Sequence, residues 1–439
     1  LTDAAPSVAN LAIINNKTSG TITLNANDAT FTGSAADLSA AFAGGLVGTQ
    51  TGAVTVSDTS GTIAATTLSS IGEQTDGVVT AASGGITISG TTAELTAALV
   101  TTASLVVAGS AAVTFTNDPT GAELAAINPK TSGTITLNDT AQAFTGTATQ
   151  LAAAFDGFGT DALTGTITIT GAAPSPTELK TISDATSGAI TLPSTNFTLS
   201  ASSSVLADAL SGNFTNYAGN VTLTDAAPSA ANLAIINNKT SGTITLNADD
   251  ATFTGTAADL SAAFSGGLQN TQTGAVTVSD TSGTIAATTL SGIGSATDGV
   301  VTAASGGITI SGTATEVTAA LVTAGSLVVA GSADVTITDT GSVAATVLSA
   351  IGAKTGGVVT CSGALTITGT TAEITDALVT TNSLVVASSA NVTFSDDPTA
   401  AQLAAINTAV GGTITLDDDT QTFSGTASDV AAAFAGGLA

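Results

Sequence analysis

Two near-identical stretches decide how this sequence is organised: LTDAAPSVANLAIINNKTSGTITLNANDATFTGSAADLSAAFAGGL starts at Leu1, and LTDAAPSAANLAIINNKTSGTITLNADDATFTGTAADLSAAFSGGL starts at Leu223. The similarity continues at an offset of 222 as far as Ser110 in the first copy and Ser332 in the second. A second match joins VTFTNDPTGAELAAIN at Val113 to VTFSDDPTAAQLAAIN at Val392, at an offset of 279. The two offsets differ by 57, so one whole repeat unit has been gained or lost between the copies, as stacked modules tolerate.

Strand-like segments repeat at the spacing of this smaller unit. One series runs from Val54 to Val392 at intervals of 53 to 59, and another from Thr21 to Thr413 at intervals of 54 to 58. The chain therefore holds about eight units of roughly 55–57 residues. We expect a first block of about four units over 1–222 and a second over 223–439, continuous with each other in one elongated solenoid.

Within one unit the predicted order is strand, short helix, strand, second short strand, helix. From Val221 the text reads VTLTD (221–225), then helical spacing over 228–236, TITLN (243–247), ATFTG (251–255) and TAADLSAAF (256–264). The last helix is preceded by a capping signal, Ser or Thr followed three residues later by Asp, Glu or Gln. This signal occurs seven times, at Ser34/Asp37, Thr91/Glu94, Thr147/Gln150, Thr256/Asp259, Thr313/Glu316, Thr370/Glu373 and Thr426/Asp429.

Iterated strand–helix–strand connections predict parallel strands with right-handed crossovers. The expected fold is thus a repeat solenoid, a right-handed parallel β-solenoid with short helices in its coils, whose coils alternate between about 22 and about 33 residues. A tandem array of immunoglobulin-like domains is the alternative, but such domains need about 100 residues and a larger aromatic core.

The composition excludes several classes of function. The chain has 439 residues, a net charge of −27, 5 Lys, no Arg, no His and one Cys. A His/Cys metal site and a His-dependent catalytic unit are therefore excluded, and a nucleic-acid surface is not expected. No apolar run is long enough for a membrane span, so we expect no membrane insertion. There is no initiator Met and no leader at Leu1, so we expect a mature or partial piece of a longer protein.

Threonines recur in T-x-T form on the strands, as at Thr21/Thr23, Thr134/Thr136, Thr166/Thr168, Thr243/Thr245 and Thr413/Thr415. Their β-propensity on a solvated sheet face explains them. The alternative is a flat Thr array that matches ice or a crystalline polysaccharide.

Acidic and Asn residues gather where strands end, and two interpretations stay open. They can form Asx turns and stacked ladders at a solenoid corner, or they can hold Ca²⁺ between coils through carboxylates and carbonyls. The calcium candidates are Asp28, Asp139, Asp249, Asp250, Asp417, Asp418, Asp419, Asp396 and Asp397. Beyond Ca²⁺ no cofactor is expected.

Lysine and glycine follow the repeat as well. Four of the five lysines, Lys17, Lys130, Lys239 and Lys354, occupy one equivalent loop, where each would place a cation at a helix C-terminus. An isopeptide cross-link to Asn is the alternative role. Glycine pairs such as Gly44/Gly45 are expected to end helices.

The chain contains the spaced motif TGxVTVSD…LSxIG…TGxITL…FTGTAxxLxAAF, and the resemblance that it carries covers the whole chain. It resembles repeats of very large secreted bacterial proteins, including motility-associated, adhesin-like and filament-forming cell-surface proteins of marine cyanobacteria. The resemblance implies a secreted structural or adhesive role and supplies no catalytic residues.

We therefore expect an extracellular structural protein that self-associates into a rod or filament on the cell surface. Its first and last residues allow head-to-tail continuation of the pattern. The alternative is an adhesin or binding module for carbohydrate or ice that uses the Thr-rich face, with glycans as partners. An enzyme on a parallel β-helix is the third hypothesis, and the absence of Arg and His argues against it.

Overall fold

The computed structural model describes residues 1–160, 162–194, 196–214, 217–361, 365–380, 384–418 and 420–439, and these form two compact units. Unit 1 consists of Leu1–Phe197 and Asp208–Tyr217, and unit 2 of Thr198–Ala207 and Ala218–Ala439. The block boundary predicted between residues 222 and 223 falls inside a strand of unit 2, β13 (Val221–Leu223). The repeat boundary in the sequence therefore differs from the division into units, and one continuous solenoid stays a prediction.

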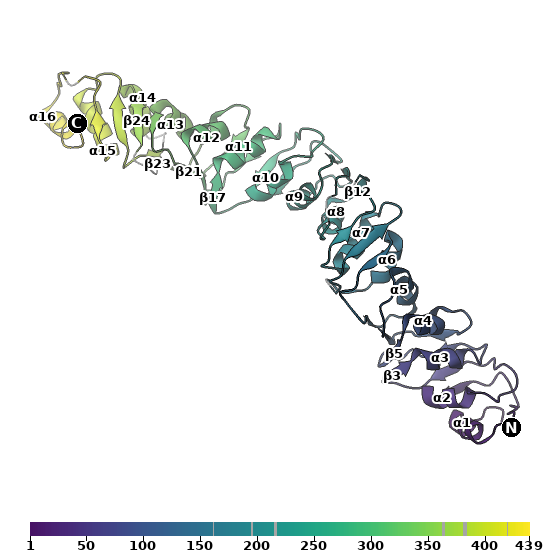
Figure 1. Ribbon diagram of the computed structural model, residues 1–439. Coiled ribbons are helices and arrows are strands. Elements are labelled where there is room, and N and C mark those ends of the chain that lie inside the picture. The colour runs from purple at the N-terminus through teal and green to yellow at the C-terminus, as the bar shows by residue number, and fades with distance from the viewer. Residues whose placement is uncertain (161, 195, 215–216, 362–364, 381–383, 419) are drawn as a thin grey trace. The chain divides into compact units, whose positions relative to one another are not determined.

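Short helices follow one another in chain order along each unit (Figure 1). Those that lie wholly in unit 1 are α1 (Val8–Lys17), α2 (Ala35–Phe42), α3 (Ala65–Gly72), α4 (Thr92–Leu95) with the π-helical turn η1 (Thr96–Val100), α5 (Gly121–Ile127) with the 3₁₀ turn η2 (Asn128–Lys130), α6 (Ala148–Phe155) and α7 (Pro176–Ala185). Helix α8 (Ser203–Leu210) has residues in both units. Unit 2 contains α9 (Ala230–Lys239), α10 (Ala257–Phe264), α11 (Ala287–Ser295), α12 (Ala314–Val317) with the π-helical turn η3 (Thr318–Val322), α13 (Ala345–Gly352), α14 (Thr371–Leu378), α15 (Ala400–Ala409) and α16 (Ala427–Ala433).

Every strand pairing in the described sheets is parallel. The sheets of unit 1 are β1 (Phe31–Gly33), β2 (Val54–Val56), β4 (Val79–Thr80) and β6 (Val106–Val107); β3 (Gly61–Ala64), β5 (Ile86–Gly90), β7 (Ala112–Phe115) and β8 (Ile135–Thr136); and β11 (Ile190–Thr191), β10 (Ile167–Thr170) and β9 (Phe144–Thr147). The sheets of unit 2 are β12 (Leu199–Ala201), β13 and β14 (Ile244–Thr245); β15 (Phe253–Gly255), β16 (Val276–Val278), β18 (Val301–Thr302) and β20 (Val328–Val329); β17 (Gly283–Ala286), β19 (Ile308–Gly312), β21 (Asp334–Ile337), β23 (Val359–Cys361) and β25 (Val385–Val386); and β22 (Ser342–Ala344), β24 (Thr366–Gly369), β26 (Asn391–Phe394) and β27 (Ile414–Thr415).

The coils are more uniform than the sequence suggested. Helices α1, α2, α3 and α4 start at Val8, Ala35, Ala65 and Thr92, so successive coils are 27, 30 and 27 residues long. The expected alternation between short and long coils is therefore wrong. The predicted long coil was measured from the TITLN segment at Thr21 to Val54. Strand β1 (Phe31–Gly33), in the ATFTG segment between them, is the strand that pairs with Val54. Each repeat unit thus contains two coils and two helices, and each compact unit is a repeat solenoid of parallel strands and helices.

The predicted helix starts are confirmed. In all seven, the Ser or Thr side chain accepts a hydrogen bond from the backbone N–H three residues later. Four are complete capping boxes, in which Glu or Gln also accepts from the cap's own N–H: Thr91/Glu94, Thr147/Gln150, Thr313/Glu316 and Thr370/Glu373. Capping boxes also start helices outside these seven positions, for example at Thr120/Glu123 and Ser175/Glu178.

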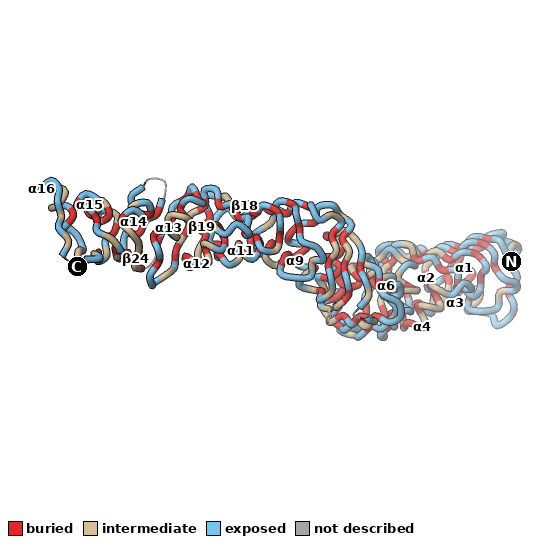
Figure 2. Tube along the Cα trace, turned by 90° about the horizontal axis from the view of Figure 1, so that it is seen from above, coloured by how far each residue is buried: buried red, intermediate tan, exposed pale blue. Residues whose placement is uncertain are grey.

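The core is narrow and continuous from coil to coil within each unit (Figure 2). Helix α2 buries Leu38 completely, and Phe42 is only 2% exposed and packs edge-on against Phe31, with ring centroids 5.3 Å apart. The equivalent pair Phe253 and Phe264 repeats this contact at 5.2 Å. Because no described helix is longer than ten residues, this packing against neighbouring coils supplies most of each helix's stability.

A threonine clamp joins successive coils at the corner before one set of strands. The Thr75 hydroxyl donates to the carbonyl of Gln50 in the preceding coil at 2.9 Å and accepts from the Gly77 N–H at 2.9 Å. The same Thr-x-Gly arrangement occurs at Thr131, Thr186, Thr240, Thr297 and Thr355. The TSG segment of the sequence is therefore a corner that bonds one coil to the next.

Within the described part of the chain, no helix has both the length and the apolarity that crossing a membrane requires.

Candidate functional site

The strand-end acids serve mainly to link coils. Asp58 Oδ2 accepts from the first N–H of α2, Ala35 N, at 2.7 Å, so a carboxylate of one coil caps the helix of the coil before it. Such a contact joins a further five side chains to backbone N–H groups: Asn117 to Thr92, Asp225 to Ser203, Asp280 to Ala257, Asp339 to Ala314 and Asp396 to Thr371. A negative charge is favourable at a helix N-terminus. Asp396, a calcium candidate, is therefore already engaged as a helix cap.

The other calcium candidates are dispersed. Asp139 accepts from Ala141 N at 2.8 Å and Asp418 from Thr420 N at 2.7 Å, so both form the expected Asx turns. The Thr420 hydroxyl and backbone N–H hold the pKa of Asp418 below its usual value. Asp249 accepts from the Asn270 side chain at 2.9 Å.

The structure places Asp28, Asp250, Asp397 and Asp417 at exposed positions of these corners, and Asp419 lies outside the described residues. Among the described residues no three His, Cys, Asp or Glu side chains gather closely enough to hold a metal ion.

The threonines form in-register ladders on the outer faces of the strands. Thr32 aligns with Thr55 and Thr55 with Thr80, one threonine per rung. At the next rung Val107 takes the place of threonine. Equivalent interruptions occur at Val329 and Val386. The ladders are only a few rungs long, and most are one threonine wide, although β9 and β10 align two threonines each, Thr145 with Thr168 and Thr147 with Thr170.

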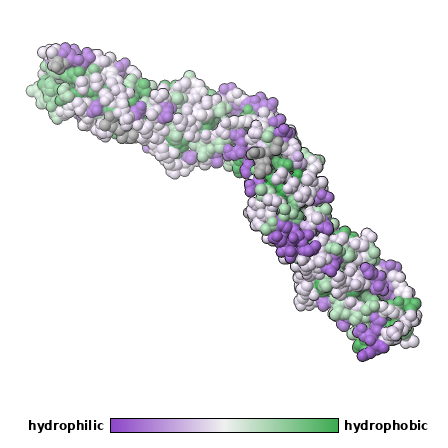
Figure 3. All heavy atoms as spheres, in the orientation of Figure 1, coloured by the Kyte–Doolittle hydropathy of each residue, from purple (hydrophilic) through white to green (hydrophobic). Residues whose placement is uncertain are grey.

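The same interruptions carry an exposed apolar cluster. Val78, Leu105 and Val107 lie on neighbouring rungs and are 47%, 37% and 47% exposed. Leu105 has a positive φ of 50°, which is uncommon for a residue with a side chain. The cluster recurs in unit 2, at Val300, Leu327 and Val329 and at Val358, Leu384 and Val386. Elsewhere the faces shown in Figure 3 are mostly of intermediate hydropathy, as the Thr- and Ser-rich composition dictates.

In most coils whose helix is equivalent to α2, the loop that follows the helix pairs with the open edge of a strand in the preceding coil. In the coil of α2, the loop runs back beside Ile22: Ile22 N–H donates to Gly45 at 2.5 Å, and Val47 N–H donates to the Ile22 carbonyl at 2.9 Å. Leu46 thereby pairs with Ile22, as Phe214, Leu268 and Leu438 pair with Ile190, Ile244 and Ile414. Four equivalent isoleucines are thus closed by a loop segment, and each is at most 5% exposed.

The fifth equivalent isoleucine, Ile135 of β8, is not closed in this way. The N–H and carbonyl groups of Ile135 face away from β7, and among the described residues nothing pairs with them. The loop after α6 turns elsewhere, because Phe158 N–H bonds back to the Phe155 carbonyl at 3.0 Å. The two rings also pack edge-on, with centroids 6.1 Å apart. Ile135 is consequently only partly buried.

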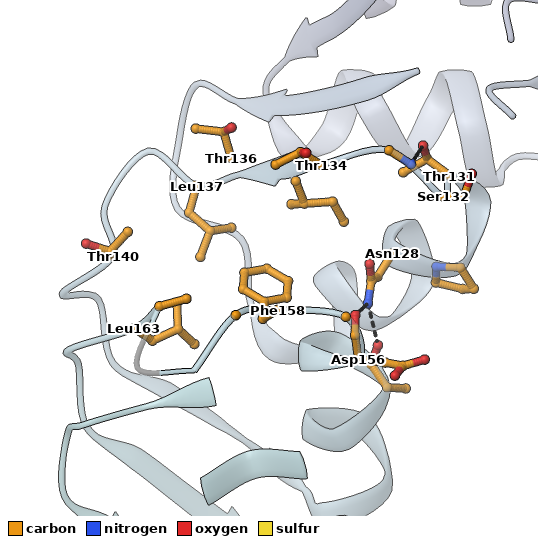
Figure 4. Close-up of a pocket in the computed structure, with 17 residues that line it drawn as sticks. Asn128, Thr131, Ser132, Thr134, Thr136, Leu137, Thr140, Asp156, Phe158 and Leu163 are labelled. Atoms are coloured by element: carbon orange, nitrogen blue, oxygen red, sulfur yellow. Dashed lines mark hydrogen bonds between the residues drawn. The ribbon is translucent and has the colours of Figure 1, made fainter. Parts of the chain in front are cut away.

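A pocket of about 700 Å³ fills the place of the missing segment. Figure 4 shows Leu137, Phe158 and Leu163 facing the space, with Thr134 and Thr136 along the strand. The pocket's far wall is held in place by Asn128, whose amide donates to the Asp156 carbonyl at 2.8 Å. This size is within the usual range of ligand pockets in proteins. Apolar side chains and an open strand edge together form what we call the β8 slot: Ile135, Thr136, Leu137, Phe158 and Leu163.

The sequence contains a signal for this slot, a departure from the repeat after α6. After α2 and α10 the chain reads AGGL (43–46) and SGGL (265–268), whereas after α6 it reads DGFG (156–159). The large residue comes one position early. Gly45 and Gly267 have φ of +87° and +80°, a conformation that is costly for Phe158 at the matching position.

The comparisons with known proteins do not identify this chain. No protein-family model and no curated protein matches it. One matching solved structure is the leucine-rich-repeat ectodomain of the Arabidopsis receptor kinase HAESA in complex with an extended IDA peptide hormone; it is 11% identical with a TM-score of 0.20, covering 88% of this chain and 69% of that one. Another is the PEPR1–AtPEP1 complex, 13% identical with a TM-score of 0.18, covering 93% of this chain and 61% of that one. Such TM-scores do not establish a shared fold.

Proposed function

We propose that this chain is an extracellular structural repeat protein whose solenoid units form a rod or filament on a cell surface. The observation that carries the proposal is that neighbouring coils complete each other. Asp58 caps the helix of the preceding coil, and Thr75 bonds the preceding carbonyl. Modules that stabilise one another in this way favour long arrays over isolated domains.

Composition and sequence resemblance support the same role. Surfaces rich in Thr, Ser and Gly, with one Cys and a net charge of −27, suit a secreted protein. The repeats resemble those of large secreted bacterial surface proteins. The exposed clusters around Leu105, Leu327 and Leu384 offer apolar area for self-association. We propose right-handed coils, because parallel crossovers adopt that hand almost without exception.

Electron microscopy of native material tests the proposal. Filaments with a regular axial repeat, which antibodies to this chain decorate, are the expected result. Protease treatment of intact cells should remove the same antigen if the protein lies outside the cell. Monomeric particles in native material, or an antigen that intact cells protect, would contradict the proposal.

A second candidate function is binding of carbohydrate or ice through the threonine ladders. It is favoured by the alignment of Thr32, Thr55 and Thr80 on successive rungs. Ice-recrystallisation inhibition and glycan pull-down are the measurements. Substitution of Thr55 by Lys should abolish either activity, while Thr66→Lys, on a helix in another part of the coil, serves as the matched control.

Calcium binding also stays a proposal. Carboxylates at repeated corners, with only five lysines in the chain, would repel one another less in the presence of a divalent ion. A melting temperature that EGTA leaves unchanged would remove it.

A further inference from the structure

We propose that the β8 slot binds an extended peptide segment of a partner polypeptide, which adds a strand to the open edge of β8. The inference is independent of the filament proposal. It rests on four equivalent positions of this chain, where a segment of the chain itself occupies the same place. These positions serve as a template for the shape and hydrogen bonding of the occupant.

The template specifies two backbone hydrogen bonds. Beside Ile22, the Gly45 carbonyl accepts from Ile22 N–H, and two residues later Val47 N–H donates to the Ile22 carbonyl. Beside Ile244, Gly267 and Gln269 make the same pair of bonds at 2.5 and 2.9 Å. Beside Ile135 both strand groups are free of such partners among the described residues. An added strand gains affinity from these main-chain bonds.

The template also specifies the side chain between the two bonds. It is Leu46, Leu268 or Leu438 in three copies and Phe214 in the fourth. In the β8 slot the corresponding space is lined by Leu137, Phe158 and Leu163, which Figure 4 shows turned toward it. The expected occupant therefore has an extended backbone and places Leu after Gly-Gly, as at Leu46, or Phe after Gly-Asn, as at Phe214.

Charge selects among possible partners. The carboxylate of Asp156 is exposed beside the pocket, and the whole chain carries a net charge of −27. The matching segments of a second copy, around Leu46, Leu268 and Leu438, are already paired with isoleucines of their own chain, and an acidic segment would be repelled at low ionic strength. The occupant is therefore a neutral or basic segment of a different polypeptide.

The probe is the synthetic peptide Ac-AGGLKG-NH2, which copies residues 43–48 with a lysine in place of Val47. We expect it, at millimolar concentration, to slow hydrogen exchange of the Ile135 amide and to leave the exchange of the Ile22 amide unchanged. Ac-AGGGKG-NH2, which lacks the leucine, should bind at least about tenfold more weakly. Ac-AGGLEG-NH2 should bind more weakly at low salt, and the difference should disappear at high salt.

Two variants make the test specific. Phe158→Gly with Gly159→Leu restores the sequence of the closed loops, and we expect it to abolish peptide binding. Gly45→Phe with Leu46→Gly makes the opposite exchange, and we expect it to create a second slot, so that the peptide protects the Ile22 amide as well. The second variant gains a property, so misfolding cannot mimic the expected result.

Three outcomes would overturn the proposal. One is the absence of protection at Ile135 at any concentration of peptide. Another is equal binding of the leucine-free peptide or undiminished binding to the restored loop. The third is a concentration-dependent dimer of the free protein that Phe158→Gly with Gly159→Leu dissolves, because it would assign the slot to a second copy of this chain.

Discussion

The loops after α2 and α6 leave equivalent helices and return to equivalent strands, yet only the first closes the edge beside it. They are equally long, since Phe42 and Val54 are separated by the same number of residues as Phe155 and Ile167. Both rejoin the solenoid at the same kind of bridge, Gln50 with Thr75 and Leu163 with Thr186. Loop length therefore does not explain the difference, and we attribute it to the order of two residues, Phe158 and Gly159, where the closed loop has Gly45 and Leu46. A repeat array can thus open one site without disturbing its neighbours.

The largest expected loss of stability concerns a glycine near the C-terminal end of each loop, where the two loops are alike. A Cβ atom at Gly52 would lie 2.0 Å from the Ala29 carbonyl oxygen, and one at Gly165 would lie 1.8 Å from that of Gln142. We expect Gly52→Ala and Gly165→Ala each to lower the free energy of unfolding by about 3 kcal/mol, because backbone must move. Urea denaturation followed by circular dichroism measures this loss.

Gly159→Ala is the matched control for these two variants, because nothing lies within 4 Å of the place that its Cβ atom would take. We expect it to change the free energy of unfolding by less than about 1 kcal/mol. Equal losses at Gly159 and Gly52 would contradict the close approach of successive coils.

The helices before the two loops differ in how the next coil caps them. Asp58 caps α2 at Ala35, whereas Gly171 occupies the matching position above α6. We expect Asp58→Ala to cost about 1–2 kcal/mol of stability, because a backbone N–H loses its acceptor. Asp58→Asn should cost much less, since Asn117 fills this role in another coil. Thermal unfolding of the two variants decides, and equal melting temperatures would count against the cap.

Exchanging the loop residues tests the comparison itself. Phe158→Gly with Gly159→Leu should raise the free energy of unfolding by about 1 kcal/mol, because it adds strand bonds and buries more of Ile135. Gly45→Phe with Leu46→Gly should lower it by a similar amount. Chemical denaturation of both variants is the measurement, and changes of the same sign in the two would refute the explanation from residue order.

The smallest expected change in stability concerns a hydrogen bond from α6 to the next coil, which has no counterpart at α2. The Thr149 hydroxyl of α6 donates to Glu178 of the next coil at 2.6 Å, and this bond, more than those from Ser175, lowers the pKa of Glu178. Because the pKa of Glu178 is lower in the folded state, the bond stabilises the fold fully above the ordinary pKa of about 4.5. This stabilisation is lost as the pH falls through the folded-state pKa.

We therefore expect Thr149→Val to reduce the melting temperature slightly at pH 7 and by a smaller amount at pH 3. Thr177→Val, on the neighbouring helix, is the control and should show no such dependence on pH. A loss that is equal at both pH values would show that Thr149 acts through packing instead.

The repeat pattern predicted much of the fold. Strand and helix order within a unit follows from hydrophobic periodicity, and the seven caps follow from local side-chain chemistry. The predicted coil lengths were wrong, because periodicity does not reveal which of two adjacent strands pairs with the next coil. The role of Asp58 could not be predicted either, since its partner Ala35 becomes a neighbour only once the register of the coils is known.

The β8 slot was missed for a different reason. Its signal, DGFG in place of AGGL or SGGL, is visible in the sequence. Its meaning depends on knowing that Leu46 pairs with Ile22, a contact between residues 24 positions apart. A departure from a repeat becomes informative only when the contact that the repeated residue makes is known.

Hydrogen exchange of two backbone amides shows whether the edge of β8 is open. Ile22 N–H is bonded to Gly45, whereas Ile135 N–H faces an open edge. In the unmodified protein without peptide, we expect the Ile22 amide to exchange slowly and the Ile135 amide to exchange rapidly. Equal protection of the two amides would mean that the loop after α6 closes over β8 as the equivalent loops close over their strands, so that no open slot exists.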